Sequence, residues 1–130
     1  MVKIFLLFSH NLTEDQVVEA QQNFKVEKFI EFPEDIRKLW SNIPPEGDIN
    51  PELLKDIQIF IEKNKSNEDY VLIQGDFGAT YMMVNWCFDN NLIPIYATTK
   101  RVYTSEETAD GSIINKHIFK HVNFRLYRKN

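Results

Sequence analysis

Short apolar runs alternate along this chain with segments whose apolar residues recur at helical spacing. Residues 2–8 and 70–73 are mainly apolar and stop abruptly, which is typical of strands buried on both faces of a parallel sheet. Residues 26–32 and 93–97 complete a set of four predicted strands. Because helical segments separate them, the pattern predicts an α/β fold with a mostly parallel central sheet and helices on both faces.

Helix signals mark the segments between the strands. Thr13 and Gln16 form a capping box, which predicts a helix over residues 13–23. Residues 33–40 are expected to form a short helix. Asn50 is followed by proline, the pattern of a cap and a first helical position, so a longer helix should begin there.

Residues 79–90 form a predicted helix that is apolar nearly all round. A helix without a polar face is buried on more than one side. In a chain this small, a second copy of the protein is the simplest source of the extra cover. We therefore expect a homodimer.

The C-terminal part of the chain predicts a β-hairpin. Its strands cover residues 102–107 and a long stretch ending at Tyr127, with a turn at residues 109–112. The hairpin should extend one edge of the sheet. Because 130 residues is the length of a single domain, we expect residues 1–130 to form one domain.

Composition and cysteine usage favour a cytoplasmic protein. Hydrophobic residues make up 43% of the chain, enough to bury a core. The lone Cys87 excludes an intrachain disulfide and suits a reducing compartment. The N-terminal apolar run is too short for a signal peptide, and no stretch is long enough to span a membrane.

Charge is divided unevenly along the chain. Residues 1–99 hold 8 basic and 16 acidic residues (net −8), whereas residues 100–130 hold 7 and 3 (net +4). An acidic protein is a poor general binder of duplex DNA, whose affinity comes from many phosphate contacts. The basic end suits a small anionic ligand, although a solvated basic strand explains it equally well.

Three strands end in segments that could bind a ligand, since ligands of such sheets bind beyond the carboxyl ends of the strands. The first segment is Ser9-His10-Asn11, where Ser9 could donate to phosphate, Asn11 could bind the ligand and His10 could act as a general base. The alternative is that all three residues only cap the following helix. We favour the ligand-binding interpretation.

The second segment joins the third strand to a helix and includes two glycines. The glycines allow close backbone approach, and the helix N-terminus offers free N–H groups to an anion. It is neither a Walker A loop nor a dinucleotide-binding fingerprint, and Asp76 is better explained as a helix cap. The candidate binding residues here are Gln74, Gly75, Asp76, Phe77, Gly78 and Thr80.

The third segment is Thr98-Thr99-Lys100-Arg101, expected as a loop after the fourth strand. Arginine holds phosphate through two parallel hydrogen bonds and lysine acts as a point charge. Thr98 and Thr99 are candidate binding residues, and Lys100 and Arg101 are candidate catalytic residues.

Two histidines leave a minor alternative open. His117 and His121 lie four residues apart on one strand face, and with Asp76 they could build a metal site. No ligand-spacing motif supports this site, so we expect neither a metal nor a cofactor.

Four stretches together resemble the small stand-alone CRISPR-associated ring nucleases of type III systems, which are related to the CARF domain. The stretches are FLLFSHNLT (residues 5–13), LWSNIPP (39–45), YVLIQGDFGATY (70–81) and PIYATTKR (94–101). The resemblance implies a CARF-like Rossmann fold, a homodimer, and a cyclic oligoadenylate ligand, above all cyclic tetraadenylate. It also implies cleavage of that ring, which would switch off antiviral signalling.

The same resemblance places functional residues. Larger CARF ring nucleases carry Ser or Thr after the first strand and Lys or Arg after a later one, positions that Ser9 and Lys100 or Arg101 fill. This chain departs from them in lacking an effector domain. Which of His10, Lys100 and Arg101 is catalytic stays open. Two alternatives also remain: a protein that only senses or sequesters the messenger, and a Rossmann-like module for another nucleotide or a protein partner.

Overall fold

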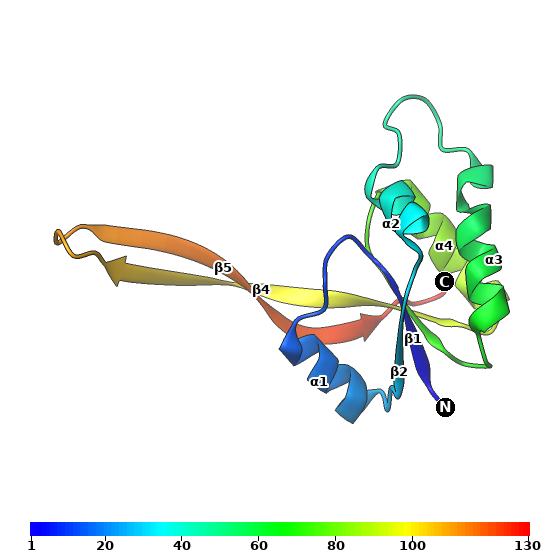
Figure 1. The fold of residues 1–130 in the computed structure, drawn as a ribbon, viewed down its shortest axis with the longest axis horizontal. Coiled ribbons are helices and arrows are strands. Elements are labelled where there is room, and N and C mark those ends of the chain that lie inside the picture. Colours follow the sequence, from blue (N-terminus) through cyan, green and yellow to red (C-terminus); the bar gives the residue numbers. More distant parts are fainter.

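The computed structural model describes residues 1–130, which form a mixed α/β fold with four helices and a five-stranded, mostly parallel sheet (Figure 1). A 3₁₀ turn, Pro51–Leu54, leads into the third helix. No helix is long and apolar enough to cross a membrane. The elements are β1 (Lys3–Leu7), α1 (Glu14–Asn23), β2 (Lys28–Glu31), α2 (Glu34–Ser41), α3 (Lys55–Asn64), β3 (Tyr70–Ile73), α4 (Phe77–Asp89), β4 (Ile93–Glu107) and β5 (Ile113–Leu126).

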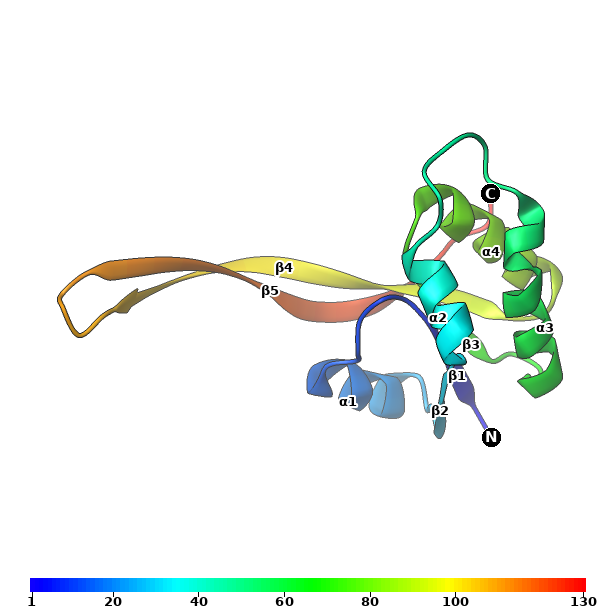
Figure 2. The ribbon, with the colours of Figure 1, turned by 45° about the horizontal axis from the view of Figure 1, so that its top comes forward.

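The strand order is β2-β1-β3-β4-β5, with β1 to β4 parallel and β5 antiparallel to β4. The predicted parallel sheet with a hairpin at one edge is therefore confirmed. The chain adds β2 on one side of β1 and β3 on the other. This reversal puts α1 on one face of the sheet and α2, α3 and α4 on the other (Figures 1 and 2).

Alternation along β1 divides the core between the two faces. Phe5 and Leu7 join the larger cluster beneath α2, α3 and α4, whereas Ile4 points to the smaller cluster under α1. All three side chains are buried. The short apolar run thus anchors both layers, as expected for a strand covered on both faces.

Most predicted element boundaries hold. The capping box of Thr13 and Gln16 is present, and Asn50 caps the turn before α3. β2 is shorter than predicted, although Val26 and Phe32 are buried. The N–H of Val26 bonds to Ala20 O of α1, so that residue closes the helix instead of joining the sheet.

The apolar helix α4 begins at Phe77, two residues earlier than predicted, because the Asp76 carboxylate accepts the Ala79 N–H at 3.0 Å. The core accounts for part of its apolar surface: Met83 and Cys87 are fully buried. Burial also raises the pKa of the Cys87 thiol to about 12. Phe77, by contrast, is 95% exposed at the carboxyl edge of the sheet.

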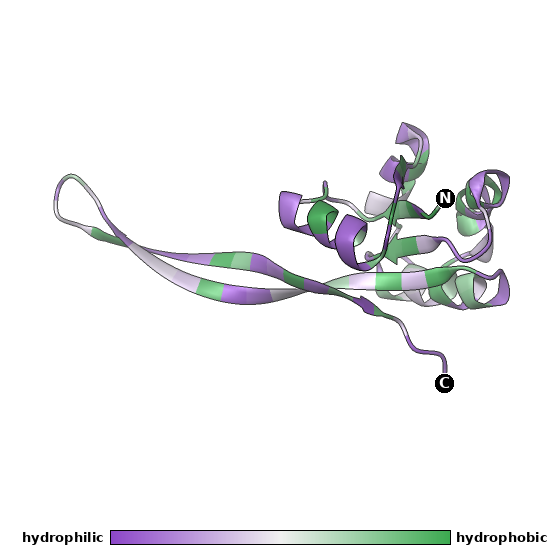
Figure 3. Cartoon of the chain, turned by 90° about the horizontal axis from the view of Figure 1, so that it is seen from below, coloured by the Kyte–Doolittle hydropathy of each residue, from purple (hydrophilic) through white to green (hydrophobic).

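The predicted loop over residues 98–101 is wrong, because β4 continues through it to Glu107. Antiparallel pairing with β5 satisfies the backbone along this whole stretch, so the chain does not need to turn. A bulge between Thr98 and Thr99 marks where the hairpin leaves the rest of the domain, which we call the body. We call residues 99–107 and 113–121 the arm, which projects far beyond the helices (Figures 1 and 3).

Candidate functional site at the carboxyl edge of the sheet

The loops after β1 and β3 meet at the carboxyl edge of the sheet. β1 and β3 are neighbours, and the Gln74 N–H donates to Leu7 O at 3.1 Å. The chain then leaves β1 toward α1 on one face and β3 toward α4 on the other. In open α/β sheets, this reversal of winding opens a crevice in which ligands bind.

The β1 loop presents three exposed polar side chains, Ser9, His10 and Asn11. The interpretation that they only cap α1 is wrong, because Thr13 caps that helix. Ser41 at the end of α2 donates to Ser9 Oγ at 3.1 Å. The His10 ring lies edge-on to Phe8 with centroids 6.4 Å apart.

Three hydrogen bonds position the β3 loop. Trp40 Nε1 donates to Gln74 O at 2.9 Å, and Gln74 Oε1 accepts the Ala97 N–H at 3.0 Å. Asp76 serves as the cap of α4, as its position in the sequence indicated. Gln74 and Asp76 therefore position the loop, and its exposed residues Gly75, Phe77 and Gly78 are the ones available to a ligand.

Tyr127, the residue after β5, supports the same loop, a role that the sequence pattern did not indicate. Its hydroxyl donates to Ile73 O at 2.7 Å, immediately before the loop. Burial, followed by the nearby Tyr96, raises the pKa of Tyr127, so the phenol stays protonated and able to donate at neutral pH. Thr80 lies beyond the loop, and its Oγ1 is buried without a protein partner.

Gly75 is required by the close packing of Trp40. A Cβ at Gly75 would lie 2.7 Å from Trp40 Nε1, whereas at Gly78 the nearest atom would be 3.5 Å away. We expect Gly75→Ala to destabilise the protein by about 1–3 kcal/mol through overpacking. Urea unfolding measures this loss, with Gly78→Ala as the matched control. Equal stability of the two variants would contradict the packing argument.

Thr98, Thr99, Lys100 and Arg101 lie at the root of the arm. Thr98 Oγ1 donates to Asn123 O at 3.0 Å, so that hydroxyl is engaged within the hairpin. Thr99, Lys100 and Arg101 are exposed. Because successive strand residues point to opposite faces, Lys100 and Arg101 address different sides of the arm. Lys100 and Arg101 therefore cannot bind one anion side by side, as they could in the predicted loop.

The register adds Lys120, which sequence reasoning missed. Lys120 lies directly opposite Lys100 across the β4–β5 ladder. Like charges in this position destabilise a sheet, and a bound anion would offset the repulsion. Counting residues back along both strands from the turn at Gly111 could have suggested this pairing.

The two histidines do not come together with Asp76. His121 Nε2 lies 2.6 Å from Glu19 Oε1 of α1, and its side chain is 5% exposed. Glu19 also accepts the Phe124 N–H, so it ties α1 to the root of the arm. His117 packs edge-on against Tyr103 at 5.1 Å. No group of three or more His, Cys, Asp or Glu side chains is placed to hold a metal ion.

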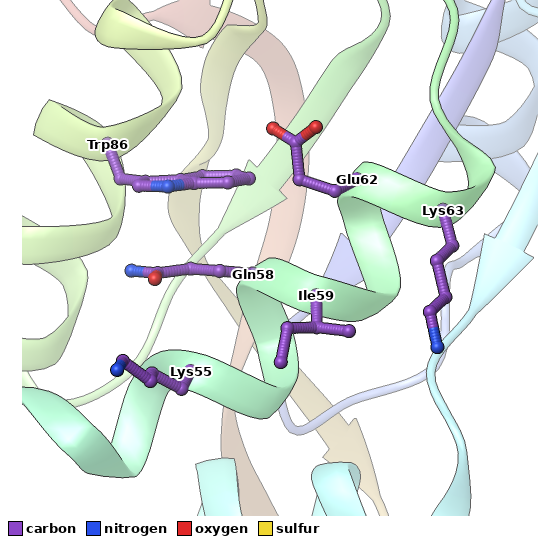
Figure 4. A pocket seen from close by; sticks show the side chains of 6 residues that line it. All are labelled: Lys55, Gln58, Ile59, Glu62, Lys63 and Trp86. Atoms are coloured by element: carbon purple, nitrogen blue, oxygen red, sulfur yellow. The ribbon is translucent and has the colours of Figure 1, made fainter.

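Two of the surface grooves lie beside α4. One lies between α3 and α4, where Trp86 extends toward α3 near Gln58 (Figure 4). It is lined by helix surfaces and contains none of the candidate residues. The second, of about 480 Å³, runs along α4 beside the C-terminal tail and includes Phe77, Thr80, Tyr81 and Arg128.

Comparison with known proteins identifies the family of this chain. The model of a family described as the uncharacterized protein MJ1673 family matches residues 2–125. The chain belongs to the MJ1673 family. One member, protein MJ1673 of Methanocaldococcus jannaschii, is 55% identical over 127 residues, which cover 98% of each chain. No solved structure matches this MJ1673-family chain.

Proposed function

We propose that this MJ1673-family protein is a ring nuclease with a CARF-like Rossmann fold. Its substrate would be a cyclic oligoadenylate, with cyclic tetraadenylate preferred, and its role would be to end type III CRISPR signalling in the cytoplasm. The observation that carries the proposal is the meeting of the β1 and β3 loops at the carboxyl edge of the sheet, where three exposed polar side chains and an exposed glycine loop follow neighbouring strands. The four parallel strands have the order 2-1-3-4, which is shared with doubly wound folds that bind nucleotides at this point.

The proposed reaction is attack by a ribose 2′-hydroxyl of the ring on its neighbouring phosphorus. The P–O5′ bond breaks, leaving a 2′,3′-cyclic phosphate and a 5′-hydroxyl that receives a proton. This reaction needs in-line positioning of the nucleophile and positive charge on the non-bridging oxygens. Ser9 would position the reacting nucleotide, and Lys100, with Lys120 opposite, would supply charge. His10 is the candidate base.

A homodimer is part of the proposal, because a ring of four identical nucleotides can be two-fold symmetric and so can a dimer. The outward side of α4 supports it: Phe77 and Tyr81 lie one turn apart and are 95% and 70% exposed. Met83, on the inward side, belongs to the core and cannot report on dimerisation.

We expect Tyr81→Glu to convert the dimer into a folded monomer, since a charge would enter an apolar contact. Light scattering measures the mass and circular dichroism the fold. The control is Met83→Glu, which should unfold the protein by placing a charge in the core. A wild-type monomer in the presence of cyclic tetraadenylate would overturn the dimer.

One assay tests the function. Purified protein is incubated with cyclic tetraadenylate and excess EDTA, and the products are separated by chromatography. Ring opening supports the nuclease. Tight binding with an intact ring indicates a sensor or a sequestering protein, and absence of binding indicates a module for another ligand.

A further inference from the structure

The arm has two chemically different faces that both lie in solvent. Pairing places Arg101 opposite Phe119 and Tyr103 opposite His117, and we call these four residues the aromatic face. The opposite face is aliphatic and lysine-bearing. It contains Lys100, Val102, Ile118 and Lys120.

The aromatic face is organised into two contacting pairs. The Arg101 guanidinium lies 5.4 Å from the centre of the Phe119 ring, within the range of a cation–π contact. The Tyr103 and His117 rings are 5.1 Å apart. Phe119 and Tyr103 nevertheless stay 65% and 59% exposed, so most of each ring is available to a partner.

The chemistry of this face matches unpaired nucleobases. Exposed aromatic rings interleaved with cations are the usual platform for single-stranded nucleic acid, because every base has a stacking surface and every phosphate a negative charge. Positive charge is concentrated on the proximal part of the arm, where Arg101 lies on the aromatic face and Lys100 and Lys120 lie on the opposite face. Farther out, the charge of Lys116 is compensated by Glu106 at 3.2 Å.

The aromatic face is also continuous with the candidate site. Arg101 follows Thr98 by three residues, which is about 10 Å at the rise of a strand. The Ala97 N–H, one residue before Thr98, bonds to the Gln74 side chain of the glycine loop. At its root the same face carries His121, which is fixed to α1 through Glu19. The aromatic face therefore begins on the strand that the glycine loop contacts, four residues beyond Ala97.

We propose that the aromatic face of the arm binds adenine bases of the oligoadenylate held at the carboxyl edge, with Phe119 stacking on one base and Tyr103 on the next. The inference rests on the ligand of the proposed function but not on its cleavage. Phe119 and Tyr103 act in binding, and the reacting phosphate stays at the edge loops.

The test uses cyclic tetraadenylate whose 2′-hydroxyl groups are replaced by fluorine, so that the ring lacks the internal nucleophile. We expect Phe119→Ala to weaken binding by about 5- to 100-fold, the effect of losing one stacked base. Phe119→Trp should restore it. Ile118→Ala is the matched control, since it removes a neighbouring side chain from the opposite face. Calorimetry measures the affinity, and urea unfolding checks that the body is unchanged.

The outcomes separate the two proposals. If wild-type protein binds the ring and Phe119→Ala binds as tightly as Ile118→Ala, the arm proposal is wrong and the proposed ligand stands. If Phe119→Ala changes the molecular mass in light scattering and leaves affinity unchanged, the arm contacts a second copy and the proposal also fails. If wild-type protein does not bind the ring, the proposed ligand itself is wrong.

Discussion

Lys100→Ala is expected to lower the rate of ring opening by about 100- to 1000-fold, because one donor to the developing charge on phosphorus is lost. Folding should be unaffected, since Lys100 is exposed on the arm. Single-turnover cleavage of cyclic tetraadenylate measures the rate. Lys120→Ala should reduce it less, because Lys120 only shares the anion, and Arg101→Ala should act mainly on affinity.

The matched control for Lys100 is Lys116→Ala, farther along the same arm and paired with Glu106. It should leave cleavage unchanged. Wild-type turnover in both Lys100→Ala and Arg101→Ala would show that the arm root takes no part in the reaction. His10 would then be the leading candidate for the catalytic residue.

Ser9→Ala should reduce cleavage strongly while keeping most of the affinity for the ring. The hydroxyl stands at the crevice and is oriented by Ser41 at 3.1 Å, so its loss affects positioning more than overall contact. His10→Ala should have the smaller effect. Rates and dissociation constants of both variants, measured side by side, give the comparison.

The opposite order would change the mechanism. A general base contributes roughly 100- to 10,000-fold and leaves an acidic limb in the pH profile. If His10→Ala binds the ring normally but never opens it, and that limb disappears, His10 is the base and positioning by Ser9 is secondary. Ser41→Ala serves as a further control, because it removes the partner of Ser9 and leaves both candidate groups in place.

The sheet was predictable because its signals are local. The apolar run before Ser9, the capping box at Thr13 and the cap at Asp76 each fix an element boundary without help from distant residues. Neighbouring parallel strands then bring their carboxyl ends together, so the meeting of the β1 and β3 loops also followed from the sequence.

What the sequence did not reveal depends on pairing between distant residues. The segment around Lys100 resembled a loop, because nothing local indicates that β5 satisfies its backbone. Lys120 and Tyr127 join the candidate site only through the register and the path of β5. Likewise, the closeness of Trp40 to Gly75 reflects packing between α2 and the β3 loop.

The unbroken course of β4 gives the arm a length that can vary independently of the body. Adding one residue to each strand next to the turn would lengthen the arm by about 3.3 Å per pair. Such insertions leave the bulge at Thr98, the position of Lys100 and the assignment of Phe119 to its face untouched, because everything nearer the body keeps its register. A single deletion in β4 between the bulge and Lys100 would instead turn every side chain of β4 beyond it to the other face and break its pairing with β5. The length of the arm can therefore change in small steps, whereas the alternation of side chains along its strands is under much tighter physical constraint.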